Sequence, residues 1–216
     1  MSLDTKAILD AIKLVREKSE KKKFNQSMEL ILNLRDIDMK KPEGKIQETI
    51  ELPHTPGKKA KVCVIATGEL ALKAKKAGAE LIINGTELEA LATDKKRQKQ
   101  LANTYDVFIA EAPLMPLVGR TLGSTLGPRD KMPKPVPPTT DIKAQIEKWR
   151  KTVTIRIRGQ PILQCAVGTE DMKDEEIADN IMTIVRRVEG KLKRGLKNIT
   201  TICLKTTMGP IVKIKL

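Results

Sequence analysis

The sequence predicts a discontinuous α+β domain, formed by both ends of the chain, with an α/β domain inserted in its middle. Two patterns lead to this prediction. Near both ends, apolar and polar residues alternate, as they do in half-exposed antiparallel strands. In the middle, short and continuous apolar runs are separated by helical segments, as in parallel sheets. We therefore expect residues 1–60 and 152–216 to form one domain and residues 61–151 to form the insert.

The N-terminal part of the first domain is expected to contain one helix and two strands. Apolar residues recur at helical spacing from Ile8 to Val15, and the following strands are recognised by alternation. The predicted elements are a helix at 5–22, a strand at 28–34, a turn at 40–44 and a strand at 46–52. Prolines and a glycine in residues 53–59 then break regular structure.

The insert is expected to be a small doubly wound α/β unit, because strands and helices alternate along it. Its predicted strands are 61–66, 81–83 and 107–110, and its predicted helices are 69–77, 87–91, 94–103 and 141–150. Asp141 follows two threonines and is expected to cap the last of these helices.

Residues 117–138 are rich in glycine and proline, and we expect them to form a long irregular loop. Two interpretations stay open for this loop. Its cations could contact RNA phosphates, since structureless loops of this length are uncommon without a function. Alternatively, it is a solvated loop that prolines keep stiff. The candidate secondary contacts are Arg120, Arg129, Lys131 and Lys134.

The C-terminal part returns to alternating strands around one long helix. The predicted strands are 153–158, 162–167, 199–204 and 211–214, and the predicted helix is 174–190. Glu175 and Glu176 lie in the first turn of that helix, where the helix dipole favours negative charge.

The charge balance favours a polyanionic partner. The chain has 41 Lys and Arg residues against 27 Asp and Glu residues, a net charge of +14. The excess is spread along the chain rather than gathered in a tail, which favours binding through counterion release by the folded protein. Only four aromatic residues are present: Phe24, Tyr105, Phe108 and Trp149. Single-stranded RNA modules need stacking platforms, so we expect a folded RNA instead.

Other functional classes find little support in the sequence. Cys63, Cys165 and Cys203 are scattered between apolar neighbours, so we expect reduced core thiols and neither a metal site nor a disulfide framework. The charged N-terminus is unlike a signal peptide, and no apolar run is long enough for a membrane span, so we expect a cytoplasmic protein. No cofactor is expected.

A nucleotide-dependent enzyme using the α/β unit is the alternative function. Gly68 forms a turn between a buried strand and a helix, but one glycine falls far short of a three-glycine phosphate fingerprint. His54 is the only histidine and stands between prolines without a nucleophile motif nearby. We expect it to be an exposed loop residue.

Residues 204–210 are predicted to form a strand that runs into a tight Gly-Pro turn. Small polar side chains beside bare backbone suit close approach by a sugar-phosphate chain. Near the N-terminus, Phe24 follows three lysines and has two interpretations: a core aromatic residue, or a packed residue that supports an RNA-facing sheet edge. Glu29 is costly near phosphates unless it accepts hydrogen bonds from ribose hydroxyls or base amines.

Several motifs occur in an order that resembles the ribosomal protein L-one family of the large subunit, in its archaeal form. They are Lys23-Phe24-Asn25-Gln26-Ser27, Leu52-Pro53-His54, the run from Leu114 to Arg120, Leu126-Gly127-Pro128-Arg129, the run from Lys131 to Pro135, and the run from Thr206 to Pro210. The resemblance covers essentially the whole chain, and the last three motifs together are very specific.

The resemblance implies a discontinuous first domain and an inserted three-layer α/β domain. It also implies binding to large-subunit rRNA at the mobile stalk near the tRNA exit site, contact with exit-site tRNA, and repression of the protein's own operon through mRNA binding. A free monomer is expected. Carried over by motif, the RNA contacts are Lys23, Phe24, Ser27, Glu29, Gly168, Thr207, Met208 and Gly209.

This sequence departs from the family pattern at two places. Gly123-Ser124 stands where relatives usually have Gly-Pro, and Asp130 stands where they usually have glycine. The acidic side chain removes positive charge from the 119–138 region and weakens the case for RNA contact there.

Overall fold

The computed structural model divides the chain into two compact units. Unit 1 contains residues 1–58 and 151–216, and unit 2 contains residues 59–150. The described residues are 4–37, 46–57, 59–157 and 159–214. The turn expected at 40–44 therefore lies outside the described residues.

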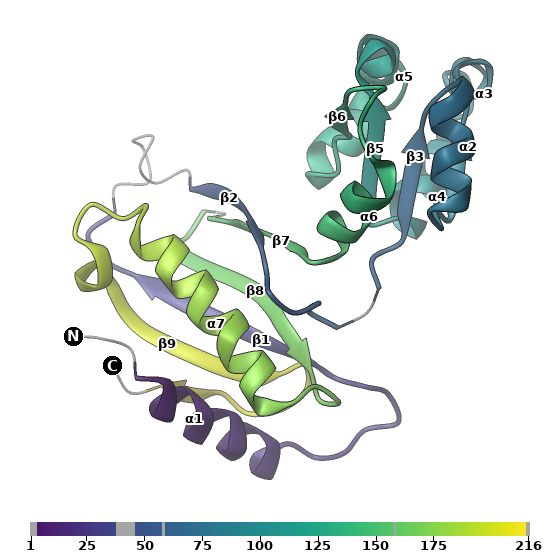
Figure 1. Ribbon diagram of the computed structural model, residues 1–216. Coiled ribbons are helices and arrows are strands. Elements are labelled where there is room, and N and C mark those ends of the chain that lie inside the picture. The colour runs from purple at the N-terminus through teal and green to yellow at the C-terminus, as the bar shows by residue number, and fades with distance from the viewer. Residues whose placement is uncertain (1–3, 38–45, 58, 158, 215–216) are drawn as a thin grey trace. The chain divides into compact units, whose positions relative to one another are not determined.

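Unit 1 is built from an antiparallel sheet and two long helices (Figure 1). Its helices are α1 (Thr5–Lys18), α7 (Asp174–Glu189) and the short η4 (Gly195–Asn198). Its strands are β1 (Ser27–Leu34), β2 (Gln47–Glu51), β7 (Thr152–Arg156), β8 (Ile162–Thr169), β9 (Ile199–Thr206) and β10 (Val212–Ile214). The main sheet has the order β10-β9-β1-β8, and β2 pairs with β7 in a separate two-stranded sheet.

The core of unit 1 lies between the main sheet and its helices. In β1 every second residue is buried, beginning with Met28, while the alternate residues from Ser27 onward face away. Residues of α1 and α7 join the buried residues of this sheet in one apolar cluster. The other face of β1 therefore stays accessible, which is the one-sided burial that the alternating sequence predicts.

The helix α1 ends earlier than predicted. Asp4 caps its start by accepting a hydrogen bond from the backbone nitrogen of Lys6 at 3.2 Å. Its regular part stops at Lys18, because Ser19 has an extended backbone. Residues 19–26 form an irregular connection, and this connection contributes to the candidate site described below.

Unit 2 is a four-stranded parallel sheet with helices on both faces. Its strands are β3 (Val62–Ile65), β4 (Leu81–Ile83), β5 (Val107–Glu111) and β6 (Lys134–Val136), in the order β4-β3-β5-β6. Its helices are α2 (Gly68–Lys76), α3 (Gly85–Leu91), α4 (Lys95–Thr104), α5 (Met115–Leu126) and α6 (Ile142–Arg150), with the short η2 (Ala112–Leu114) and η3 (Gly127–Arg129).

Two separate apolar clusters give unit 2 a helix–sheet–helix layering. One cluster joins α2 and α6 to the sheet, and the other joins α3, α4 and α5 to it. The strand β3 is buried along its whole length, as the continuous apolar run predicts. The backbone nitrogen of Lys143 donates to Asp141 at 3.0 Å, so the predicted cap of α6 is confirmed.

The prediction of a long loop over 117–138 is wrong. The helix α5 occupies residues 115–126, η3 follows it, and β6 adds an edge strand to the sheet. Val118, Leu122 and Leu126 are buried at a spacing of one helical turn, so the apolar periodicity outweighs the glycines. A glycine costs a helix interior about 1 kcal/mol relative to alanine, which burial of this face offsets.

The departure at Asp130 occurs at a strained backbone position. Asp130 has a φ of 57° and a left-handed conformation at the end of η3. Glycine adopts this conformation without steric cost, while aspartate is among the residues that tolerate it. A glycine at this position would therefore adopt the same backbone without this strain.

The thiols lie in the packed interior or beside it. Cys63 is buried in β3, Cys203 is buried in β9, and Cys165 is partly buried in β8. Burial raises the pKa of the Cys63 thiol, and likewise that of Cys165, to about 12. Over the described ranges, no group of side chains suited to holding a metal ion occurs, and no helix has the length and apolarity for a membrane crossing.

Candidate nucleic-acid interface

Three segments that are distant in the sequence meet at one end of the main sheet. Strand pairing places Ser27 opposite Thr169, and Met28 opposite both Gly168 and Thr206. We call this region the converging end and define it as residues 19–29, 168–172 and 205–210. It contains all eight primary site residues predicted from the sequence, so the register of β1, β8 and β9 brings them together.

The β1 and β9 segments are fixed to each other by Ser27 and Thr207. The backbone nitrogen of Thr207 donates to the carbonyl oxygen of Ser27 at 3.0 Å. The Thr207 hydroxyl lies 3.2 Å from the nitrogen of Ser27, from which it accepts, and 3.3 Å from its carbonyl oxygen, to which it donates. The hydroxyl is therefore held by the protein backbone, with limited remaining capacity for RNA.

Two apolar side chains are exposed at the converging end. Met208 is 66% exposed and Phe24 is 50% exposed. The expectation that Phe24 packs into the protein is therefore wrong. Gln26 takes the buried position in this segment instead, with no exposed surface. Burial of a glutamine in preference to a phenylalanine has no signature in hydropathy, which explains why the sequence reasoning missed Gln26.

A depression beside Phe24 has a volume of about 460 Å³ and is strongly charged. Its lining residues are Arg16, Ser19, Lys21, Lys22, Lys23, Phe24, Asn25, Glu170 and Asp171. Lys22 binds Glu20 at 2.7 Å, and this contact lowers the pKa of the Glu20 carboxyl. Asn25 donates a hydrogen bond to Asp171. In the described part of the chain, Lys21 and Lys23 form no ion pair, which leaves both cations available to phosphates.

Glu29 lies on the half-exposed face of β1, directly across from Lys205 of β9. Opposite charges at facing positions of an antiparallel pair are favourable. This register gives the carboxylate a structural reason to be there, independent of any contact with ribose or bases.

Both predicted glycines of the site are required by packing within the protein. A β-carbon on Gly168 would lie 2.9 Å from Cγ1 of Ile177, in α7. A β-carbon on Gly209 would lie 2.3 Å from the Thr206 hydroxyl oxygen and 3.2 Å from that of Ser19. Gly209 does not have a positive φ, so packing rather than backbone conformation accounts for a glycine at this position.

Comparisons with known proteins identify the family to which the chain belongs. A model of the ribosomal protein L1p/L10e family matches residues 15–210. The chain belongs to this family. The chain is 48% identical over 207 residues to the large ribosomal subunit protein uL1 of Methanothermobacter thermautotrophicus, covering 96% of this chain and 98% of the relative. It is 45% identical over 216 residues to the protein of the same name from Pyrococcus abyssi, covering 100% and 98%.

The candidate secondary contacts of this L1-family chain are mostly engaged within unit 2. The Lys131 ammonium donates to the carbonyl oxygens of Ala102 and Tyr105 at 3.0 and 2.7 Å. Arg129 donates to Asn103 of α4. The ammonium of Lys134 lies 5.4 Å from the centre of the Trp149 ring. Arg120 is exposed on α5. These four residues do not form the single basic loop that the sequence suggested.

The turn at Gly68 is occupied by a carboxylate. Gly68 has a φ of 55°, as a tight strand-to-helix turn requires. The backbone nitrogen and the hydroxyl of Thr67 both donate to Glu111 at 3.0 Å. This carboxylate stands at the start of α2, where a nucleotide phosphate would need to bind, so it would repel one.

His54 is more constrained than an exposed loop residue. Its backbone nitrogen donates to the Asn180 side chain at 3.1 Å, and its carbonyl oxygen accepts from the same side chain at 3.2 Å. Its imidazole Nε2 lies 3.6 Å from Asp179. These contacts connect the segment after β2 to α7, which is a structural role.

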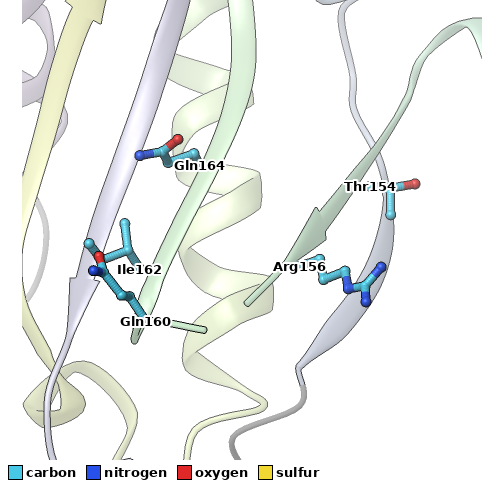
Figure 2. A pocket seen from close by; sticks show the side chains of 5 residues that line it. All are labelled: Thr154, Arg156, Gln160, Ile162 and Gln164. Carbon is cyan, nitrogen blue, oxygen red and sulfur yellow. The ribbon is translucent and has the colours of Figure 1, made fainter. Parts of the chain in front are cut away.

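A second depression in unit 1, of about 310 Å³, lies between β7 and β8. Figure 2 shows its lining side chains: Thr154 and Arg156 on β7, and Gln160, Ile162 and Gln164 along and just before β8. None of the predicted site residues lines it, so it is separate from the converging end.

Proposed function

We propose that the protein binds folded large-subunit rRNA at the mobile stalk near the tRNA exit site, and that the converging end makes the contact. The convergence of three segments carries this proposal. It places exposed apolar groups and unpaired lysines together on one small surface. Such a surface suits recognition of a folded RNA by shape and backbone contacts rather than by base stacking.

The test is a binding measurement on the intact protein with a folded rRNA stalk fragment and a scrambled RNA of equal length. We expect the stalk fragment to bind far more tightly at moderate salt. Equal affinity for both RNAs would contradict the proposal and would identify a nonspecific basic scaffold.

The RNA-binding domain is proposed to consist of residues 1–60 and 152–216, interrupted by the inserted domain at 61–151. All eight primary site residues fall in the first set. We expect a chain in which a short linker replaces residues 61–151 to fold and to bind the stalk fragment nearly as well as the full chain. A folded protein with much weaker binding would move the main site to the insert.

Two further roles follow from the family resemblance: help in releasing exit-site tRNA, and repression of the protein's own operon through an mRNA that mimics the rRNA site. We also propose that the protein is cytoplasmic and associated with the ribosome, and that it is a monomer when free. If one surface serves rRNA and mRNA, the two RNAs compete. Simultaneous binding of both RNAs to one protein molecule would contradict a shared site.

The alternative is a nucleotide-dependent enzyme that uses the α/β unit. Glu111 at the start of α2 disfavours it, since a carboxylate there opposes phosphate binding. A thermal-shift screen with nucleotides separates the two functions: stabilisation by a nucleotide would support the enzyme, and its absence together with stalk RNA binding would support the ribosomal role.

A further inference from the structure

Gln26 is completely buried, and its carboxamide contacts all parts of the converging end. Its carbonyl oxygen accepts from the backbone nitrogen of Met208 at 3.0 Å. Its amide nitrogen donates to the Glu170 carboxylate at 2.8 Å and to the backbone carbonyl oxygen of Glu20 at 3.0 Å. The same nitrogen lies 3.3 Å from the Ser19 hydroxyl oxygen, which also accepts from it. Every partner is consistent with one orientation of the amide, because acceptors surround the nitrogen and a donor faces the oxygen.

The backbone of Gln26 strengthens the link to the β8–α7 turn. The nitrogen of Glu170 donates to the Gln26 carbonyl oxygen at 3.0 Å, and the Gln26 nitrogen lies 3.4 Å from the Glu170 carboxylate. The Ser19 hydroxyl is in turn 2.8 Å from the Thr206 hydroxyl. The network therefore joins the end of α1, the β8–α7 turn and the end of β9 through buried or half-buried contacts.

We propose that Gln26 is a positioning residue for RNA recognition, which fixes the exposed Met208 relative to Lys23 and Phe24. The inference rests on the proposed function of the converging end. Gln26 itself touches no solvent, so its effect on RNA acts through the segments it joins. A buried amide with both ends bonded to different segments specifies their relative placement more narrowly than apolar contact does.

Several charged groups surround this amide. The Arg16 guanidinium donates to the carbonyl oxygens of Glu170 and Met172, the first at 2.7 Å, and binds Asp174 at 2.9 Å. The Glu20 carboxylate binds Lys22, so it is turned toward another partner. Glu170 is therefore the acidic group that directly contacts the Gln26 side chain.

The exchange Gln26→Glu tests the network with a change of only one atom. At neutral pH, the introduced carboxylate repels the Glu170 carboxylate, and it no longer has the N–H group that donates to Glu170 in the wild type. At lower pH, one shared proton restores a donor between the two carboxyl groups while the Met208 contact is kept. We expect stalk RNA affinity relative to wild type to be about tenfold weaker at pH 7.5 and to recover to within about threefold at pH 5.5.

Asn198→Asp is the matched control. Asn198 is a buried amide in the same unit, at the opposite end of β1, where it accepts from the Arg194 nitrogen at 2.8 Å and donates to the Arg35 carbonyl oxygen at 3.0 Å. This variant makes the same chemical change away from the converging end. We expect it to lower the melting temperature and to leave relative RNA affinity unchanged at both pH values.

Gln26→Leu covers the case in which Gln26→Glu does not fold. It removes the network without introducing charge, and we expect a folded protein whose preference for stalk over scrambled RNA is reduced at every pH. Circular dichroism at the binding temperature establishes folding for each variant. Folded Gln26→Glu or Gln26→Leu protein with wild-type preference at pH 7.5 would overturn the inference, as would an equal loss in Asn198→Asp.

The wild-type measurement separates the two proposals. If wild type shows no preference for stalk RNA, the proposed function fails. If wild type prefers stalk RNA and the Gln26 variants match it, only the positioning role fails.

Discussion

The two ends of the main sheet are each built around a buried carboxamide, but the amides hold different things. Asn198 connects the turn before β9 to the end of β1, and an ion pair between Arg194 and Asp36 lies beside it. Gln26 instead connects three segments, and the surface above it exposes Phe24 and Met208. Similar buried chemistry therefore holds different sets of segments together at the two ends of the sheet.

Among substitutions at the converging end, a change of Gly209 should have the largest effect on stability and on RNA binding. In Gly209→Val, the new side chain collides with the Thr206 and Ser19 hydroxyls, which bond to each other. Overpacking of this kind costs about 1–3 kcal/mol of stability. We expect a lower melting temperature together with loss of stalk RNA preference, measured by calorimetry and by binding. Unchanged melting would contradict the packing explanation, whatever the affinity.

Removal of the exposed apolar groups should weaken binding without changing stability. Met208→Ala and Phe24→Ala each remove a side chain that is at least half exposed in the free protein. If RNA covers them, each change should cost about 1–2 kcal/mol of binding free energy. Leu72→Ala on α2 is the control, since Leu72 is 65% exposed outside the converging end. An equal loss of RNA affinity in all three variants would show that the converging end is no more important for binding than the exposed surface of α2.

Lys23 should contribute through its charge. For Lys23→Gln we expect a modest loss of affinity and a decrease of about 0.7–0.9 in the slope of log affinity against log salt, as one phosphate contact is lost. The exposed Lys13 on α1 provides the control, because Lys13→Gln removes the same charge away from the site. For wild type, affinity should fall with salt but keep a large salt-insensitive part. Complete loss of binding at moderately raised salt would argue against a specific site.

The smallest expected effect is a gain in stability within α5. Gly123 lies in this helix with open space around the position of a β-carbon. Gly123→Ala should therefore stabilise unit 2 by about 0.5–1 kcal/mol. Thermal unfolding followed by circular dichroism measures the gain, and RNA affinity should stay constant. A loss of stability would show that this position is not as open as its surroundings indicate.

Local patterns in the sequence are sufficient to predict most of the helices and strands. The alternation of β1, the buried run of β3 and the helical spacing of α7 depend on neighbouring residues alone, and the structure contains all three. The helix α5 was missed because glycines and prolines suggested a break, whereas burial of Val118, Leu122 and Leu126 decides the outcome. Burial against a sheet far away in the sequence is not visible to a local pattern.

The candidate site could be predicted only in part. Motif resemblance identified the eight residues, but their meeting depends on strand register, which no single segment encodes. The sequence also could not predict that Gln26 is buried while Phe24 is exposed. A buried amide is favourable only where separate segments supply its hydrogen-bond partners. The collision at Gly209 is mainly with Thr206, but the Thr206 hydroxyl is bonded to that of Ser19, which is 190 positions before Gly209 in the chain.

The cysteines make each unit separately observable. Cys63 belongs to unit 2, whereas Cys165 and Cys203 belong to unit 1. The pKa values of Cys63 and Cys165, near 12, keep these thiols protonated at neutral pH, and thiols react as thiolates. Cys63 and Cys203 are also buried within their units, so alkylation of either thiol requires local opening of the unit that contains it. The rates of modification at these two sites, followed by peptide mass spectrometry, compare the opening of both units in one unmodified sample.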